Sequence, residues 1–370
     1  MSVELNAKSF PVSFAALEQE AKMKMSEGGY GYVRSGASHE ETLQKNAQGF
    51  EKLSIVPRML RDVADVDMSV TIGGRTYPFP VFLAPVGMQK LTHEEGELAS
   101  ARAAAAIGVP FVQSTVSSYS IEEIKAGTNS SPKWFQLYWS RNEQVTFSMV
   151  NRAEQAGYEA IVLTVDTVMT GWRETDIAAD FSPLKLGFGK ANYENDPAFM
   201  AALDNHENEA VIQSLLENIH YPNLNWSHVA ELKKRTKLPI YIKGILHPED
   251  AKLAVENGVD GIIVSNHGGR QLDGIISAID ALPSIVTEVD GAIPVLFDSG
   301  IRRGTDVVKA LALGAKAVFI GRPFIYGLAV GGQTGVEKIL ENFIEETKIT
   351  MSLAGISKVC DLPSIKLIRE

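Results

Sequence analysis

The feature that most constrains the fold is a repeated alternation along the chain. Eight short apolar runs are each followed by a polar loop and then by a helix-like segment. The runs are rich in Val, Ile, Leu and Phe, which is typical of parallel strands buried on both faces. They span residues 81–85, 110–114, 134–138, 160–166, 239–244, 261–266, 294–300 and 317–322. Segments rich in Ala, Leu, Glu and Lys separate them, such as 94–107, 143–156, 248–257 and 305–313.

Eight such units predict an α/β fold, a (β/α)₈ TIM barrel. An open doubly wound sheet is the alternative, but it would usually have fewer strands and a free edge. The barrel is assigned to residues 61–370, with an amphipathic closing helix at 335–354. Residues 1–60 are predicted to form an N-terminal helical extension, in which Gly28-Gly29 ends the first helix and a loop carries Tyr32.

The regular spacing is broken once, between the fourth and fifth strands. Residues 170–226 are much longer than a usual connection and its helix. They are predicted to form a lid over one end of the barrel, mobile and partly ordered, with a helix at 207–219. The alternative is a surface insertion with no part in the site.

Composition excludes several classes of partner. With 45 acidic and 35 basic side chains the net charge is -10, which argues against nucleic acid and leaves local arginines to attract an anionic substrate. One cysteine, Cys360, cannot form a disulfide framework or a cysteine-based metal site, and no metal is predicted. No signal peptide or bilayer-spanning segment is visible, so we expect a cytoplasmic protein that does not bind membranes.

Chemically capable side chains gather where the predicted strands end. In a barrel these ends form one rim, which is where such enzymes place their active sites. His267 and Arg270 lie three residues apart across a Gly-Gly turn, so a base and an anion clamp could converge on one small acid. The alternative is a polar loop with a satisfied histidine. The strand-end residues are Pro85, Ser114, Gln136, Tyr138, Asp166, Lys243, His267, Asp298 and Arg322.

Two glycine-containing turns with arginines point to a phosphate. They follow the seventh and eighth strands, at 298–304 and 320–323, where barrels commonly bind phosphate. The alternative is that the glycines only close tight turns. A phosphate-bearing cofactor with a flat ring could bind there. Lys243 then has three possible roles: an ion pair with a neighbouring Asp, a positive charge beside an isoalloxazine, or a Schiff base.

Several motifs together resemble the FMN-dependent 2-hydroxy-acid oxidising family, which includes glycolate oxidase, lactate oxidase and lactate 2-monooxygenase. The similarity runs from about Tyr32 to the end of the closing helix. Residues 114–118 and 171–173 are most similar to the lactate 2-monooxygenase branch. The motifs are Ser-Asn-His-Gly-Gly-Arg-Gln at 265–271, Lys-Gly at 243–244, Asp-Ser-Gly-Ile-Arg-Arg-Gly at 298–304, Trp-Phe-Gln-Leu-Tyr at 134–138 and Leu-Thr-Val-Asp-Thr at 163–167.

The resemblance implies a role for each matching residue. His267 would be the base, and Asp166 would stabilise its imidazolium form; the sequence does not choose between hydride transfer and a carbanion. Arg270 and Arg173 would clamp the substrate carboxylate. Hydrogen bonds to the substrate would come from Tyr32 and Tyr138.

The resemblance also implies an FMN site. Lys243 would stabilise the negative charge on the reduced ring. The ring would contact Pro85, Val86, Gly87, Ser114, Gln136, Thr164, Lys243 and Ser265. The phosphate side would comprise Asp298, Ser299, Gly300, Arg302, Gly321 and Arg322.

Three departures refine the hypothesis. Val116 replaces the aromatic residue of glycolate and lactate oxidases, which leaves substrate size open. Gly87 replaces the alanine of lactate oxidase and resembles the monooxygenase branch. No haem domain or membrane-seeking segment is visible, which favours O₂ as electron acceptor.

The resulting hypothesis is FMN-dependent oxidation of a short L-2-hydroxy acid, with L-lactate expected, by a homo-oligomer (tetramer or octamer). The products would be pyruvate and H₂O₂, or acetate, CO₂ and water for a 2-monooxygenase. The alternatives are a non-catalytic flavin-binding sensor and a dehydrogenase with another acceptor. An isomerase of a phosphorylated substrate is disfavoured, because two arginines beside a histidine suit a small acid better.

Overall fold

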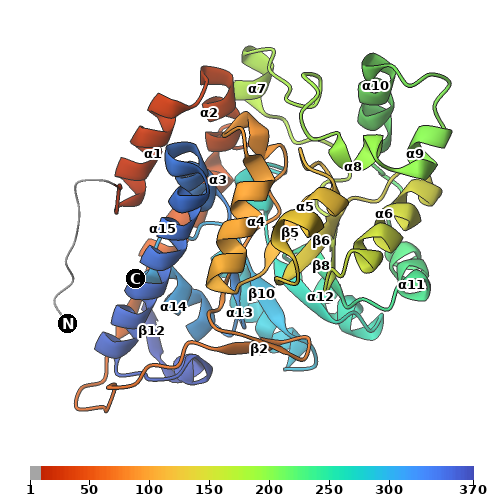
Figure 1. Ribbon diagram of the computed structural model, residues 1–370. Coiled ribbons are helices and arrows are strands. Elements are labelled where there is room, and N and C mark those ends of the chain that lie inside the picture. Colours follow the sequence, from red (N-terminus) through yellow and green to blue (C-terminus); the bar gives the residue numbers. More distant parts are fainter. Residues whose placement is uncertain (1–9) are drawn as a thin grey trace.

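The computed structural model describes residues 10–370, and eight parallel strands close into a barrel, which confirms the predicted (β/α)₈ fold (Figure 1). The strands are hydrogen-bonded in the order β10-β11-β4-β5-β6-β7-β8-β9. Each predicted apolar run contains one of them. Their bounds are β4 Val81–Leu83, β5 Phe111–Gln113, β6 Lys133–Leu137, β7 Ile161–Thr164, β8 Ile240–Ile245, β9 Gly261–Val264, β10 Val295–Phe297 and β11 Val318–Ile320.

Helices surround the barrel, one after each strand (Figure 1). The last, α15, includes the closing helix predicted at 335–354, and a further helical segment that begins at Arg322 and has buried apolar residues from Phe324 onward precedes it. A kink separates the two segments, because Gly331 and Gly332 have non-helical φ and ψ angles. No helix among residues 10–370 is long and apolar enough to cross a bilayer. The bounds are α4 Gly96–Ile107, α5 Ile121–Thr128, α6 Glu143–Gln155, α11 Trp226–Arg235, α12 Pro248–Glu256, α13 Ala278–Val289, α14 Gly304–Ala312 and α15 Arg322–Ala354.

The N-terminal extension contains three helices, α1 Phe14–Lys24, α2 Glu27–Arg34 and α3 Glu41–Glu51. The prediction that Gly28-Gly29 ends the first helix is wrong, because Ser26 caps a new helix by accepting a hydrogen bond from the Gly29 N–H (3.1 Å). The glycines serve close packing, since a Cβ at Gly28 would lie 2.6 Å from the Phe181 ring. Tyr32 therefore projects from α2 and not from a loop. Residues 1–9 of the extension lie outside the described residues.

Short strands and 3₁₀ turns complete the chain. After α15, strand β12 pairs antiparallel with β1 of the extension. The division at residue 60 stays a prediction. The bounds are β1 Leu53–Val56, β2 Val70–Ile72, β3 Arg75–Tyr77, β12 Lys366–Arg369, η1 Gln89–Leu91, η2 His267–Gly269 and η3 Val359–Ser364.

Aromatic side chains fill the barrel interior. Trp134 stacks on Tyr241 with ring centroids 4.7 Å apart, and both Phe82 and Phe319 pack edge-on against Trp134. A packed interior leaves no passage along the barrel axis, so a ligand can bind only at an end.

The long insertion covers the rim where the strands end. It contains α7 Glu174–Ala178, α8 Ala191–Glu194, α9 Pro197–Ala201 and α10 Asn208–Asn218, and α10 matches the helix predicted at 207–219 (Figure 1). Buried Asn192 fixes the insertion to the barrel, because its amide donates to the carbonyls of Ser114 and Thr115 (3.1 Å each). The mobility of this lid stays a prediction.

Candidate active site

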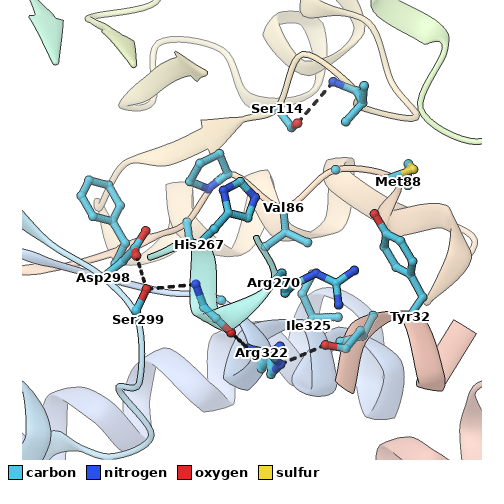
Figure 2. Close-up of a pocket in the computed structure, with 18 of the residues that line it drawn as sticks. Tyr32, Val86, Met88, Ser114, His267, Arg270, Asp298, Ser299, Arg322 and Ile325 are labelled. Atoms are coloured by element: carbon cyan, nitrogen blue, oxygen red, sulfur yellow. Dashed lines mark hydrogen bonds between the residues drawn. The ribbon is translucent and has the colours of Figure 1, made fainter. Parts of the chain in front are cut away.

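A cavity opens at the C-terminal rim of the barrel, beneath the lid and beside α2 (Figure 2). Its wall contains most residues that the sequence predicted for the site. Asp166, Gln136, Thr164 and Ser265 do not line it but lie behind residues that do. The predicted residues in the wall are Tyr32, Pro85, Val86, Gly87, Ser114, Tyr138, Arg173, Lys243, His267, Arg270, Asp298, Ser299, Gly300, Arg302, Gly321 and Arg322.

His267 forms an ion-pair geometry with Asp166, with 2.8 Å between His267 Nδ1 and Asp166 Oδ1. Burial alone would raise the pKa of Asp166, but the charges of His267 and Lys243 and a hydrogen bond from Thr167 lower it to about 2. Burial lowers the pKa of His267. An ionised Asp166 accepts the Nδ1 proton of a neutral imidazole, so His267 Nε2 keeps its lone pair and can act as a base.

The loop that carries His267 has an unusual backbone. His267 has φ 59°, and Gly268 and Gly269 also have positive φ, a conformation that a non-glycine residue keeps only when its surroundings impose it. Asn266 supplies that constraint, because its side-chain amide exchanges two hydrogen bonds with Asn46 of α3 (2.7 and 2.8 Å). The N-terminal extension therefore holds the loop of His267 in place.

Arg270 and Arg173 lie near the same phenol ring. Their guanidinium carbons are 4.6 and 5.9 Å from the centre of the Tyr32 ring, and Figure 2 shows Arg270 beside Tyr32. Arg270 Nη1 donates to the Ser35 carbonyl (2.6 Å), whereas its buried Nη2 has no hydrogen-bond partner in residues 10–370. Burial and the nearby Arg173 lower the pKa of Arg270 to about 10, so it stays charged at neutral pH. An anion would satisfy that nitrogen.

Tyr138 follows β6 and faces the cavity. Burial, and then the charge of Asp166, raise its pKa to about 12. Its hydroxyl therefore keeps its proton and can donate a hydrogen bond to a ligand.

Lys243 lies at the bottom of the cavity and is only 4% exposed. Its Nζ is 3.3 Å from Asp298 Oδ2 and donates to Ser265 Oγ (2.9 Å). Burial opposes the charge, but Asp298 and Asp166 raise the pKa of Lys243 above its ordinary value. Lys243 therefore has the neighbouring Asp that one of its three interpretations requires. A Schiff base is disfavoured, because a permanently charged ammonium cannot act as the nucleophile that forms one.

The loops after β4 and β5 approach closely beside the cavity. A Cβ at Gly87 would lie 2.6 Å from both the carbonyl oxygen and a methyl group of Val116. Ser114 donates to Gln136 Oε1 (3.1 Å), and Gln136 donates on to Thr164 Oγ1 (3.1 Å). Gln136 and Thr164 thus orient the wall from behind.

Two partly buried arginines, Arg302 and Arg322, lie on the opposite side, after β10 and β11. Arg322 donates to three backbone carbonyls, those of Val33, Ser35 and Gly268 (2.9 to 3.1 Å). Neither Arg322 nor Arg302 forms a salt bridge with any carboxylate of the described chain. Burial, and then the charge of Arg302, lower the pKa of Arg322 to about 10. A phosphate dianion would supply the missing negative charge, so this side fits a phosphate-bearing cofactor.

Comparison with known proteins identifies the class. The family model of the FMN-dependent dehydrogenases matches residues 21–369, and the chain belongs to this family. It is 59% identical to an L-lactate oxidase of Lysinibacillus sphaericus, over 98% of this chain and 94% of that protein. It is 42% identical to 2-hydroxyacid oxidase 1 of Mus musculus, over 94% of each chain. A crystal structure of mandelate oxidase superposes with a TM-score of 0.88 and 41% identity, covering 97% of this chain and 99% of that one.

FMN is the cofactor of this family, and the cavity has the side chains that FMN needs. A charged lysine stands on one side, and two arginines that form no salt bridge with a carboxylate of residues 10–370 stand on the other.

The structure adds three residues that the sequence did not single out for the site. Ser35 holds Arg270 through its carbonyl, and Thr167 donates to Asp166 Oδ1 (2.9 Å). Asp176, on the lid, has its Oδ2 3.9 Å from Arg270 Nη2. Thr167 directly follows Asp166 in the sequence, which could have suggested it, whereas the contact of Asp176 with Arg270 depends on how the lid folds.

Proposed function

We propose that this enzyme uses FMN to oxidise a short L-2-hydroxy acid, L-lactate in the first place, with O₂ as electron acceptor. The observation that carries the proposal is the position of His267. Its Nδ1 is held by an ionised Asp166, and its ring borders the same cavity as Arg270 and Arg173. A base and an anion clamp on one cavity suit a small hydroxy acid.

In this proposal His267 Nε2 takes a proton from the hydroxyl or the α-carbon of the substrate. Asp166 stabilises the resulting imidazolium, to which its Oδ1 already lies within hydrogen-bond distance. FMN, when bound, accepts two electrons from the substrate and passes them to O₂.

The carboxylate of the substrate would bind between Arg270 and Arg173. Support comes from the unpartnered Nη2 of Arg270, which lies beside Tyr32. Tyr32 and Tyr138 would donate hydrogen bonds to the carboxylate and hydroxyl ends of the substrate. Tyr138 suits this role because its raised pKa keeps its hydroxyl protonated. These contacts would orient the reacting carbon toward His267.

FMN would be held by the two sides of the same cavity. The ring side would comprise residues 85–87, Ser114 and Lys243, with Gln136, Thr164 and Ser265 behind them. The phosphate side would comprise Asp298, Ser299, Gly300, Arg302, Gly321 and Arg322.

The products distinguish the two outcomes of lactate oxidation. Purified protein is incubated with L-lactate in air, and pyruvate, H₂O₂, acetate and CO₂ are quantified. Pyruvate with an equal amount of H₂O₂ defines an oxidase, whereas acetate with CO₂ defines a 2-monooxygenase. The second outcome is supported by Gly87 and by residues 171–173, which resemble the lactate 2-monooxygenase branch. If no 2-hydroxy acid changes the flavin absorbance without air, the proposal fails and the flavin-binding sensor is favoured.

We also propose a homo-oligomer, tetramer or octamer, in the cytoplasm. Exposed apolar side chains at Met59, Leu60 and Leu353 support an interface between copies. A cytoplasmic location agrees with the lone cysteine, Cys360, which is free. Light scattering on the purified protein tests the assembly, and a monomeric mass would contradict it.

A further inference from the structure

Asp176 brings a negative charge to the arginine pair from the lid. It lies on α7, and its Oδ2 is 3.9 Å from Arg270 Nη2. The side chains of Asp176 and Arg270 are each 13% exposed. Helix α7 packs on α2, the helix of Tyr32, since a Cβ at Gly31 would lie 3.3 Å from a methyl group of Thr175. The carboxylate is therefore held beside the clamp by the fold of the lid.

The contact between Asp176 and Arg270 differs from an ordinary structural ion pair. Such pairs usually form two short parallel hydrogen bonds. Here the distance is 3.9 Å, and both Asp176 Oδ1 and Arg270 Nη2 are buried without a partner among the described residues. Asp176 therefore acts on the clamp through its charge, while the guanidinium remains free to bind a ligand.

The charges around the clamp leave a single positive charge for the ligand. Two guanidiniums, of Arg270 and Arg173, face one carboxylate, of Asp176; burial raises the pKa of that carboxyl above its ordinary value, and the charges of both arginines oppose the rise. The other ionisable groups at the bottom of the cavity are engaged with one another, neutral His267 with the carboxylate of Asp166 and Lys243 with that of Asp298. One substrate carboxylate balances the clamp formed by Arg270, Arg173 and Asp176, and a second carboxylate would find no further positive charge within the clamp.

The position of Asp176 also fits a selecting role. A second cavity under the lid shares Tyr32, Tyr138 and Arg173 with the cofactor cavity, and Asp176 lines only this outer cavity. A ligand that reaches the clamp from beneath the lid passes along this wall. The other charged groups of the outer wall, Asp180 and Lys185, are exposed and opposite in sign.

We propose that Asp176 makes the enzyme selective for monocarboxylic 2-hydroxy acids by cancelling one of the two positive charges of the clamp. This inference rests on the proposed function. Because like charges a few ångströms apart in a partly buried site repel strongly, removal of the Asp176 charge should favour a dicarboxylate about tenfold.

The test compares two four-carbon substrates that differ mainly in one charge, L-malate and L-2-hydroxybutyrate. The ratio of their kcat/KM values is measured for the FMN-loaded wild type, Asp176→Asn and Asp180→Asn. The ratio of malate to hydroxybutyrate should rise about tenfold in Asp176→Asn and stay within twofold in Asp180→Asn, which removes an equal charge from the same outer wall. Asp176→Ser is measured alongside, so that a folding defect of Asp176→Asn alone does not decide the result.

A rise below fivefold in the variants of Asp176, or an equal rise in Asp180→Asn, would overturn the inference. Binding gives a readout independent of turnover: the affinities of succinate and butyrate are measured by flavin absorbance, and the same change in their ratio is expected. If wild type oxidises no 2-hydroxy acid, the proposed function fails, whereas the binding ratio still decides the role of Asp176.

Discussion

Replacement of Asp166 by asparagine tests how much the buried carboxylate contributes to the base. The pKa of Asp166 is about 2 against an ordinary 3.8, and this difference corresponds to about 2.4 kcal/mol at 1.36 kcal/mol per unit. The main favourable contribution is the charge of His267, whose Nδ1 is 2.8 Å away. Because the group is buried, solvent screens this interaction little. Loss of that stabilisation should slow proton abstraction about 60-fold.

The assay mixes FMN-loaded enzyme with L-lactate without air and follows the decrease in flavin absorbance. Asp166→Asn should slow this phase at least 50-fold, while butyrate binds within threefold of wild type because the arginine clamp is unchanged. Thr167→Val is the control, since it removes neutral hydrogen-bond contacts to the same carboxylate (2.9 Å) and to His267 Nδ1 (3.3 Å) but no charge, and it should cost less than tenfold. A loss below fivefold in Asp166→Asn would refute the assignment of Asp166 as the partner of the base.

Three further predictions follow from burial and backbone geometry. Because burial lowers the pKa of His267 from 6.5, the acidic limb of kcat/KM against pH should have its midpoint below 6.5, and a midpoint above 7 would contradict a neutral base. Burial raises the pKa of Glu97 from 4.5 to about 7. The stability that the bound proton provides is therefore complete below 4.5 and lost by about pH 7, and in chemical denaturation Glu97→Gln should remove about 3 kcal/mol of this pH dependence; parallel pH curves for the two proteins would disprove it. Gly300 has φ 96°, and a Cβ there would lie 2.5 Å from the Asn46 carbonyl oxygen. Gly300→Ala should therefore weaken FMN binding at least tenfold in a fluorescence titration, whereas Gly74→Ala, with φ 78° and open space around the Cβ, should leave it within twofold. Equal affinities for both variants would contradict the role given to the loop.

The barrel and most of the site wall could be predicted because both depend on local patterns. A doubly buried parallel strand reads as an apolar run, and the residue that follows it must lie at the rim. His267, Arg270, Lys243 and Arg322 all follow or end such runs and line the cavity. The motif at 265–271 was specific enough to suggest the family, which the comparisons confirm.

The features that escaped prediction depend on contacts between distant segments. Gly28-Gly29 has a low helix propensity, and packing against Phe181 of the lid outweighs it. The charge of Asp176 acts on Arg270, and nothing in the linear pattern places the lid helix against that loop. The Asn46–Asn266 amide pair likewise joins the extension to the barrel between residues that lie 220 positions apart in the sequence.

The most direct test of the central claim replaces His267 by alanine. Wild type and His267→Ala, both loaded with FMN, are mixed with L-lactate without air, and the rate of flavin bleaching is recorded. Loss of a positioned base should slow bleaching by roughly 10² to 10⁴-fold, with FMN content and butyrate affinity close to those of wild type. Bleaching of His267→Ala at near the wild-type rate would contradict the account.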